Sequence, residues 1–520
     1  MQTCFLKGAA VVNASRTADS HCISAIMPPR PPPPPFVPPY PTPALAKNVL
    51  FLAVDDMRPN LGAYNFSAYG RVGDPGVKSH SPHLDKLAGE GMLFSRAYVQ
   101  YSFCSPSRNS FMSGRRPDTT KVWEFLDHFR EPAVGGDAWV TLPQFFKEHG
   151  YATYGAGKLY HPNMPPNNDV PLSWSPETLY VTPHDDNFTC AFQGPQLIGK
   201  QDLPPAKHYV WCEINTAANS STLYGQKVRD ACIAHLRLAK NASASARPFF
   251  VGCGFHKPHA PYHAPREFFD ALPPPSTMGL PLDPYAPVGM PDVAWHPYAD
   301  TGMGKLIGMT PAFNGTVNLT KLQVWRRAYY AAISYTDHNI GMVLNELDAL
   351  GMAENTIVVV FGDHGYQLGE HATWSKMTNF ELGVRIPLII RAPFYPTSAG
   401  KESSVLAEMV DIYPTLADLA GLPPPRSVRG AEGINGTSLA PVFHATTVDD
   451  ATGARLRAVS RALKRAAFSQ FAKIGASAGP GFPWGTSVRP EFHRNQTELM
   501  GYTVRTDEWR YTAWFRFDND

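Results

Sequence analysis

Short apolar runs alternate with amphipathic stretches along most of the chain. Continuous apolar runs are typical of buried strands, and apolar residues at helical spacing are typical of helices packed on one face. We predict strands at 47–56, 151–158, 247–255, 355–365 and 385–393, and helices at 82–91, 141–150, 223–240, 321–350 and 409–421. Because strands and helices alternate, the pattern predicts an α/β fold whose large, mostly parallel sheet is covered by helices on both faces.

The two ends of the chain depart from this pattern. Residues 1–45 contain "PPRPPPPPFVPPYPTP", which is typical of a stiff polyproline spacer, so we expect a disordered segment there. The α/β domain is predicted over 46–440, with Pro-rich insertions at 161–220 and 258–315. After residue 440 the pattern weakens, and 501–517 resembles an antiparallel hairpin. We therefore predict a smaller C-terminal subdomain over 441–520.

Composition excludes some classes of function. The 520 residues include 46 basic and 44 acidic side chains, a net charge of +2, with no basic run that would favour nucleic-acid binding. No stretch approaches the roughly 20 apolar residues of a membrane-spanning helix, so no transmembrane segment is expected. The first residues also lack the uninterrupted apolar segment of a signal peptide.

The cysteines and the N-glycosylation sequons are evidence for the cellular compartment of the protein. Seven cysteines leave at least one unpaired within the chain. Cys190 and Cys212 flank a polar loop and are the candidate disulfide, with a reduced pair as the alternative. Nine N-x-S/T sequons favour the secretory pathway, whether lysosomal, vacuolar or extracellular; they begin at Asn13, Asn65, Asn187, Asn219, Asn241, Asn314, Asn318, Asn435 and Asn495.

One cysteine lies in a setting suited to binding an anion. In "CSPSRNSFMSG", Pro106 suits the first turn of a helix and Gly114 the position after its end, so Cys104 is placed at a helix N-terminus. Free backbone N–H groups there favour a tetrahedral anion, and Arg108 lies one turn along. Taken alone, the residues allow a nucleophile facing phosphate or sulfate, a phosphatase-like thiolate, or a buried cysteine beside an ordinary helix cap.

Acidic pairs follow two of the predicted strands. Asp55 and Asp56 end the first strand, and Asp363 and His364 end a later one. Carboxyl ends of parallel strands meet at one edge of a sheet. Three carboxylates there suit Ca²⁺ or Mg²⁺, and the histidine, a softer ligand, makes Mn²⁺ a further alternative.

The run Cys104-Ser105-Pro106-Ser107-Arg108, followed by Gly114-Arg115, resembles the signature of the type I sulfatases. In that family a formylglycine-generating enzyme converts the cysteine to formylglycine, whose hydrate offers one hydroxyl as nucleophile and a second to expel the sulfate. The resemblance covers about 48–514. It implies an alkaline-phosphatase-like sandwich with 46–440 as its catalytic domain. Family members continue past the equivalent of Asp520, which implies an incomplete C-terminal subdomain.

The pair Asp363-His364 resembles the iduronate-2-sulfatase branch and the related phosphonate monoester hydrolases. Three further motifs resemble the iduronate-2-sulfatase branch: "GKLYHP" (157–162), "GFHKPHAPY" (254–262) and "DHGYQLGEHATWSK" (363–376). The resemblance implies that Asp55, Asp56, Cys104, Asp363 and His364 bind the cation, most simply Ca²⁺. It implies catalytic roles for Cys104, Arg108, Lys158, His161, His259 and Lys376: Arg108 activates the nucleophile, Lys158 steadies the diol, His161 is the base, and His259 or Lys376 protonates the departing alcohol. His256, Lys257 and His371 are expected to support the loops around them.

The sequence therefore predicts a metal-dependent sulfuric ester hydrolase acting on a sulfated carbohydrate such as a glycosaminoglycan. Two alternatives remain at this point: a phosphonate or phosphate ester hydrolase of the same fold, and a truncated homologue that binds sulfated glycans without cleaving them. An iduronate substrate also requires recognition of its carboxylate. Arg115, Arg116 and Lys257 are the candidates for that contact.

Overall fold

The computed structural model describes most of the chain downstream of the Pro-rich segment. The described residues are 46–66, 79–184, 188–196, 209–215, 223–242, 247–281, 283–295, 306–308, 317–425, 433–446, 453–474 and 494–517. The predicted disordered segment 1–45, which includes Cys4 and Cys22, lies outside them.

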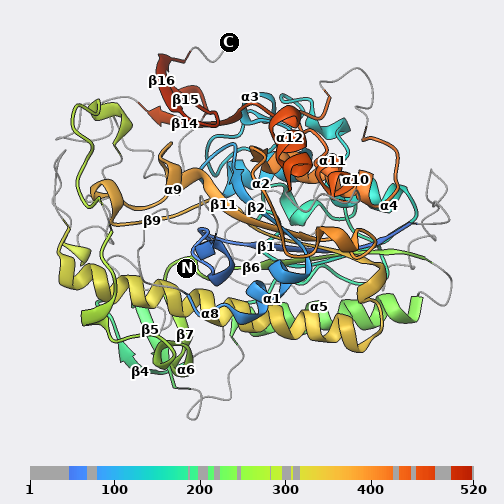
Figure 1. The fold of residues 1–520 in the computed structure, drawn as a ribbon, viewed down its shortest axis with the longest axis horizontal. Helices are drawn as coiled ribbons and strands as arrows, with labels where there is room; N and C mark the ends of the chain where they lie inside the picture. Colours follow the sequence, from blue (N-terminus) through green and yellow to red (C-terminus); the bar gives the residue numbers. More distant parts are fainter. Residues whose placement is uncertain are drawn as a thin grey trace, which may run out of the picture. The chain divides into compact units, whose positions relative to one another are not determined.

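An eight-stranded sheet forms the centre of the fold (Figure 1). Its strands are β1 (Asn48–Val54), β2 (Met92–Tyr98), β3 (Ala152–Gly157), β6 (Phe249–Phe255), β8 (Thr356–Gly362), β11 (Arg385–Arg391), β12 (Lys401–Ser403) and β13 (Ala407–Glu408). The order is β12-β2-β11-β8-β1-β6-β3, with β13 also on β2. Only β11 runs antiparallel to its neighbours, β2 and β8. The predicted α/β class and mostly parallel sheet are confirmed, although β2 was not among the predicted strands.

Helices cover both faces of this sheet. The longer helices are α1 (Pro82–Glu90), α2 (Cys104–Ser113), α4 (Leu142–Glu148), α5 (Tyr224–Ala242), α8 (Leu319–Ala349), α10 (Ile412–Leu419), α11 (Ala440–Ala445) and α12 (Ala454–Leu463), and the shorter ones include α3 (Pro117–Thr120), α6 (Arg266–Asp270) and α9 (Glu381–Val384). Side chains of β1 alternate between the two faces. Leu50 and Leu52 join the core with α5 and α8, whereas Val49 and Phe51 join the core with α2, α4 and α10. Figure 1 shows α5 and α8 on one side of the sheet and α2 and α10 on the other.

Side chains cap the helices at several points. The Thr141 hydroxyl accepts a hydrogen bond from the Gln144 N–H at the start of α4, which confirms the predicted cap. At the start of α1, the backbone N–H groups of His83 and Leu84 donate to the Asp337 carboxylate on α8, so this carboxylate both caps α1 and joins the two helices. Among the described helices, none combines the length and the hydropathy required to span a membrane.

Three smaller sheets surround the central one. The strands β14 (Ala467–Ile474), β15 (Thr497–Arg505) and β16 (Arg510–Arg516) form an antiparallel sheet, so the hairpin predicted at 501–517 is confirmed. A second sheet contains β4 (Cys190–Gln193), β5 (Trp211–Ile214) and β7 (Tyr262–Pro265), and a third pairs β9 (Gln367–Leu368) with β10 (Trp374–Ser375). Strand β14 approaches the central domain directly, because the Gln470 N–H donates to the Gln100 carbonyl at 2.8 Å.

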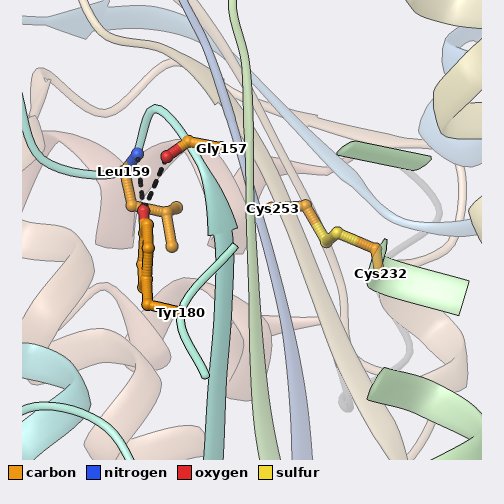
Figure 2. Close-up of a disulfide and its surroundings, with 5 residues drawn as sticks. All are labelled: Gly157, Leu159, Tyr180, Cys232 and Cys253. Atoms are coloured by element: carbon orange, nitrogen blue, oxygen red, sulfur yellow. Dashed lines mark hydrogen bonds between the residues drawn. A yellow bond between two sulfur atoms is a disulfide. The ribbon is translucent and has the colours of Figure 1, made fainter. Parts of the chain in front are cut away.

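Two disulfides are present among the described residues. Cys190 bonds to Cys212, as the sequence suggested, and Cys232 on α5 bonds to Cys253 on β6, which the sequence did not single out. Figure 2 shows the second bond joining the helix to the central sheet. Among the described cysteines only Cys104 is free, so the pairing leaves one buried thiol.

We expect the bond between α5 and β6 to contribute to stability. It closes a loop with a sequence separation of 21 residues, for which loss of unfolded-state entropy contributes about 3 kcal/mol. The double variant Cys232→Ala/Cys253→Ala should lower the free energy of unfolding by about 2–4 kcal/mol in guanidinium titrations. Under reducing conditions the free energies of unfolding of wild type and variant should converge, apart from the cost of the removed sulfur atoms. A difference in free energy that reduction leaves unchanged would contradict a stabilising role of the disulfide.

Candidate active site

Three neighbouring strands bring their carboxyl ends to the same level. In β1, Val54 lies opposite Phe255 of β6 on one side and Gly362 of β8 on the other. The residues that follow these strands therefore meet at one edge of the sheet. Asp55 is fixed there because its N–H donates to the Phe255 carbonyl at 3.0 Å, and the Asp363 N–H donates to the Val54 carbonyl at 3.0 Å.

The free cysteine lies over this edge. Helix α2 begins at Cys104 and is ended by Gly114, whose φ of 68° is the left-handed conformation that glycine adopts without strain. The buried Cys104 sulfur lies 3.4 Å from Asp55 Oδ1, 3.3 Å from His364 Nε2 and 3.1 Å from Lys376 Nζ. The predicted helix start is confirmed, and the thiol faces the acidic strand ends.

Arg108 joins the helix to the strand ends. Its guanidinium is fully buried; Nε donates to Asp363 Oδ2 at 2.9 Å and a second nitrogen lies 3.6 Å from Asp55 Oδ1. The remaining nitrogen donates to the backbone carbonyls of Lys158 and Leu159. One planar cation therefore fixes two carboxylates and the turn after β3.

That turn presents Lys158 to the cluster. Lys158 Nζ donates to Asp55 Oδ2 at 2.5 Å. The turn depends on Gly157, whose φ is 77° and where an added Cβ would lie 2.1 Å from the Gly254 carbonyl oxygen. The Tyr180 hydroxyl donates to the Gly157 carbonyl at 2.7 Å and accepts from the Leu159 N–H at 3.4 Å, as Figure 2 shows. These contacts fix the backbone on both sides of Lys158.

Lys376 reaches the cluster from a strained loop. Both its neighbours have positive φ, 81° for Ser375 and 74° for Met377, a conformation that costs free energy in residues other than glycine. Lys376 Nζ contacts Asp56 Oδ1 as well as the Cys104 sulfur. Despite burial, the carboxylates around Lys376, led by Asp56, hold its pKa well above the usual range, so the side chain is a permanent cation.

Two histidines after β6 complete the wall of the site. The His259 ring stacks on the His256 ring with centroids 4.6 Å apart, and His256 Nδ1 lies 3.2 Å from Asp55 Oδ2. His259 Nδ1 donates to the Ala260 carbonyl at 2.5 Å, which leaves Nε2 for other partners. His256 therefore contacts Asp55 directly, whereas the sequence predicted only that it supports its loop.

Three other predicted residues lie outside these contacts. The ring of His161 packs on Phe125 at 4.2 Å, and burial together with nearby Lys158 lowers the pKa of His161 to about 2. No hydrogen bond joins its side chain to Cys104. Lys257 Nζ donates to the carbonyls of His259 and Pro261, which fits a role in supporting the loop. His371 packs on Phe380 and pairs with Asp283.

The acidic strand ends have the chemistry of a cation site. Asp55, Cys104, Asp363 and His364 each offer one donor atom, and these atoms all lie within 4.8 Å of one another; Asp56 and His259 join Asp55 and Cys104 in an overlapping set. His364 Nδ1 donates to the Gly365 carbonyl at 3.0 Å, so Nε2 presents a lone pair to the carboxylates, as a metal-binding histidine does.

Burial and neighbouring charges shift the pKa values of the three carboxyl groups in different directions. Burial raises the pKa of Asp363 to about 7, and the neighbouring Asp55 adds to the rise. Burial likewise raises the pKa of Asp56, although Lys376 opposes it. Asp55 differs: despite burial, Lys158 and His259 hold its pKa well below the usual range. A bound divalent cation would favour the charged form of all three, so the residues present fit a metal ion.

Comparison with known proteins assigns the family. The sequence model of the Sulfatase family matches residues 47–422. This chain belongs to the sulfatase family, the sulfuric ester hydrolases. It is 33% identical to iduronate 2-sulfatase of Mus musculus over 518 residues, which cover 91% of this chain and 85% of that protein.

Solved structures share the fold of this sulfatase. Phosphonate monoester hydrolase of Agrobacterium radiobacter superposes with a TM-score of 0.61 at 19% identity, covering 90% of this chain and 89% of that one. A 2-O GAG sulfatase superposes with a TM-score of 0.57, also at 19% identity, covering 91% and 83%. The alkaline-phosphatase-like fold expected from the sequence is therefore confirmed.

We expect a divalent cation to stabilise the fold through this cluster. Calcium added to chelator-treated protein should raise the melting temperature, because a ligand at 100 times its Kd stabilises the native state by about 2.7 kcal/mol. The variant Asp363→Asn should melt lower and should lose most of the calcium-dependent shift. The exposed Asp137 provides the control: Asp137→Asn should keep the full shift. An equal shift in Asp363→Asn would contradict the assignment of this ligand.

Proposed function

We propose that this sulfatase removes sulfate from a sulfated sugar of a glycosaminoglycan, as an iduronate-2-sulfatase-like enzyme. The observation that carries the proposal is the convergence of Arg108, Lys158 and Lys376 on Cys104 and the acidic ends of β1 and β8. Three cations around a buried nucleophile position suit the transfer of a negatively charged group, because charge develops on its oxygens in the transition state. The 33% identity to iduronate 2-sulfatase supports the choice of substrate class.

A divalent cation, Ca²⁺ in the first instance, is proposed to be held by Asp55, Asp56, Asp363 and His364, with the side chain at position 104. It would supply Lewis-acid polarisation of the ester and of the nucleophile. The protein's own contribution is to hold these donors in place. Arg108 does so by binding Asp363 and Asp55 at once.

Formylglycine derived from Cys104 is proposed as the nucleophile; its hydrate would supply one hydroxyl for attack and a second for release of sulfate. The run Cys104-Ser105-Pro106-Ser107-Arg108 at the start of α2, together with the match to the Sulfatase family, supports this modification. Lys158, bonded to Asp55, would steady the hydrated side chain.

Proton transfer to the departing alcohol is assigned to His259. Its Nδ1–H is engaged by the Ala260 carbonyl, so the ring must first take up a proton on Nε2, and the resulting imidazolium then gives that proton to the departing oxygen. Lys376 is better suited to hold negative charge, because the carboxylates around it keep it cationic. His161 remains the candidate base for the second step, because its lowered pKa keeps the imidazole neutral and its buried Nδ1 has no hydrogen-bond partner among the described residues.

The compartment proposed is the secretory pathway, in keeping with the relatives and the two disulfides. Maturation there would require a formylglycine-generating enzyme as a partner.

We expect Cys104→Ala to abolish hydrolysis of aryl sulfates, with kcat/KM reduced by at least about 10⁴-fold, since the nucleophile is removed. The melting temperature should change little, because the variant removes only a single buried sulfur atom. In wild type, mass spectrometry of the peptide containing residue 104 should show an aldehyde oxygen in place of the thiol. The control Ser113→Ala, which removes a hydroxyl bonded only to backbone carbonyls of α2, should retain activity. An unmodified thiol in an active preparation would contradict the proposed nucleophile.

The role of His259 can be tested with esters of different leaving groups. In His259→Gln, kcat/KM should fall by about 10²–10⁴-fold for a sugar sulfate, whose alkoxide needs a proton. For an aryl sulfate with an acidic phenol the loss should be much smaller. Equal losses for both esters would point to a positioning role instead. Aryl phosphonate esters assayed beside them would reveal whether the enzyme prefers phosphonates to sulfates.

A further inference from the structure

The sequence candidates for recognising a substrate carboxylate are engaged elsewhere. The Arg115 guanidinium lies over the Trp139 ring at 4.3 Å, and Arg116 pairs with Glu408 at 2.6 Å. The Lys257 ammonium donates to the two carbonyls of its own loop. A group that binds a second anion on the substrate must therefore come from another part of the chain.

Lys473 on β14 has the required properties. Its side chain is 2% exposed, and its Nζ donates to the Trp295 backbone carbonyl at 3.2 Å. The ammonium also lies 5.5 Å from the centre of the Phe471 ring and 6.0 Å from that of Trp514. Among the described residues no carboxylate pairs with it, and burial lowers the pKa of Lys473 to about 7.

A buried ammonium without a counter-ion is costly, typically by several kcal/mol. The same region pairs another buried lysine fully: Lys464 donates to Glu408 and Asp411, each at 2.6 Å. A methionine could fill the place of Lys473 with no charge to bury. Positions that break a general rule of protein interiors in this way are often functional.

The register of β14 places Lys473 toward the nucleophile. Gln470 forms a parallel bridge with Tyr101, so both segments run in the same direction, one toward Cys104 and the other toward Lys473. Phe471 and Lys473 share a face of β14 because side chains alternate along a strand. The Phe471 ring packs on the Tyr101 ring at 4.9 Å, so this face is turned to the segment that leads into α2.

The aromatic partner of Lys473 adjoins the loop that presents Lys376. A Cβ added to Gly501 would lie 2.8 Å from the Trp514 ring and 2.9 Å from Asn379 Nδ2, so the three residues are in close contact. Asn379 also donates to the Gly501 carbonyl at 2.9 Å. Asn379 follows Lys376 by three residues, so the Trp514 ring packs against the segment that leads from the Lys376 loop.

We propose that Lys473 binds the carboxylate of a hexuronate and thereby selects sulfated uronate sugars as substrates. The substrate carboxylate supplies a counter-charge that none of the described residues provides, and the apolar surroundings strengthen the ion pair. Trp514 and Trp295 offer flat apolar surfaces beside it for the sugar ring. This assignment rests on the proposed function, since it concerns the same site and names the second anionic group it recognises.

The test compares two substrates that differ only in this group: the methyl glycoside of iduronate 2-sulfate, and its carboxyl-reduced analogue with a hydroxymethyl group in place of the carboxylate. Wild type should prefer the uronate in kcat/KM by about 10- to 100-fold, the range expected for a hydrogen bond between charged groups. In Lys473→Met and Lys473→Gln this preference should fall to about threefold or less. Lys473→Arg, which keeps the charge, should retain part of it.

Arg516 on β16, in the same three-stranded sheet, is exposed and serves as the matched control. Arg516→Met removes a cation from the same sheet and should keep the wild-type preference. Lys473→Met should melt no lower than wild type, because it replaces an unpaired buried charge with an apolar side chain. An undiminished preference in both uncharged Lys473 variants, or no preference in wild type, would overturn the role of Lys473 but not the proposed function. Wild type that hydrolyses neither substrate nor an aryl sulfate would overturn the proposed function as well.

Discussion

The site depends on the fully buried guanidinium of Arg108. The ends of β1 and β8 bring buried carboxylates close together, an arrangement that repulsion would otherwise drive apart. Arg108 offsets that repulsion by contacting Asp55 and Asp363 at once. It also fixes the turn that carries Lys158. Because Arg108 lies one helical turn after Cys104, the same residue fixes the position of the nucleophile relative to the strand ends.

The outer part of the site is held by a second buried network. Arg58 lies four residues after the end of β1 and pairs with Glu370 at 3.0 Å, while Arg326 of α8 lies 3.7 Å from the same carboxylate. Glu370 Oε2 in turn accepts from the Leu368 N–H at 2.6 Å. This network fixes the loop that ends in the strained turn around Lys376. The strain at that turn is therefore supported by contacts remote from the substrate, which is how a reactive lysine can be held between Asp56 and Cys104 before any ligand binds.

Features of the fold and the site that depend on local sequence could be predicted, and contacts between distant segments could not. The apolar run ending in Asp55 and Asp56 is a local signal, as is the Pro106 and Gly114 pattern around α2. The contact between β14 and Tyr101 joins segments about 370 residues apart, and no local pattern reveals it. For the same reason the sequence did not indicate the Cys232–Cys253 bond, the contact of His256 with Asp55, or the isolation of Lys473. Arg115 and Arg116 looked suitable because of their place beside the motif, but their side chains turn to Trp139 and Glu408.

We assign different functions to the basic side chains at the strand ends and to Lys473. The cluster at the strand ends contains three carboxylates, Asp55, Asp56 and Asp363, and three basic side chains, Arg108, Lys158 and Lys376. These charges nearly balance, so a divalent ion would give the cluster the positive charge that a sulfate ester needs. None of this distinguishes one sulfate ester from another. Discrimination requires a cation outside the cluster, in a place where only one additional anionic group of the right substrate can reach it. Lys473 is the cation that we propose for this task, and β14 belongs to a separate sheet, which can change without altering the strand ends that support hydrolysis.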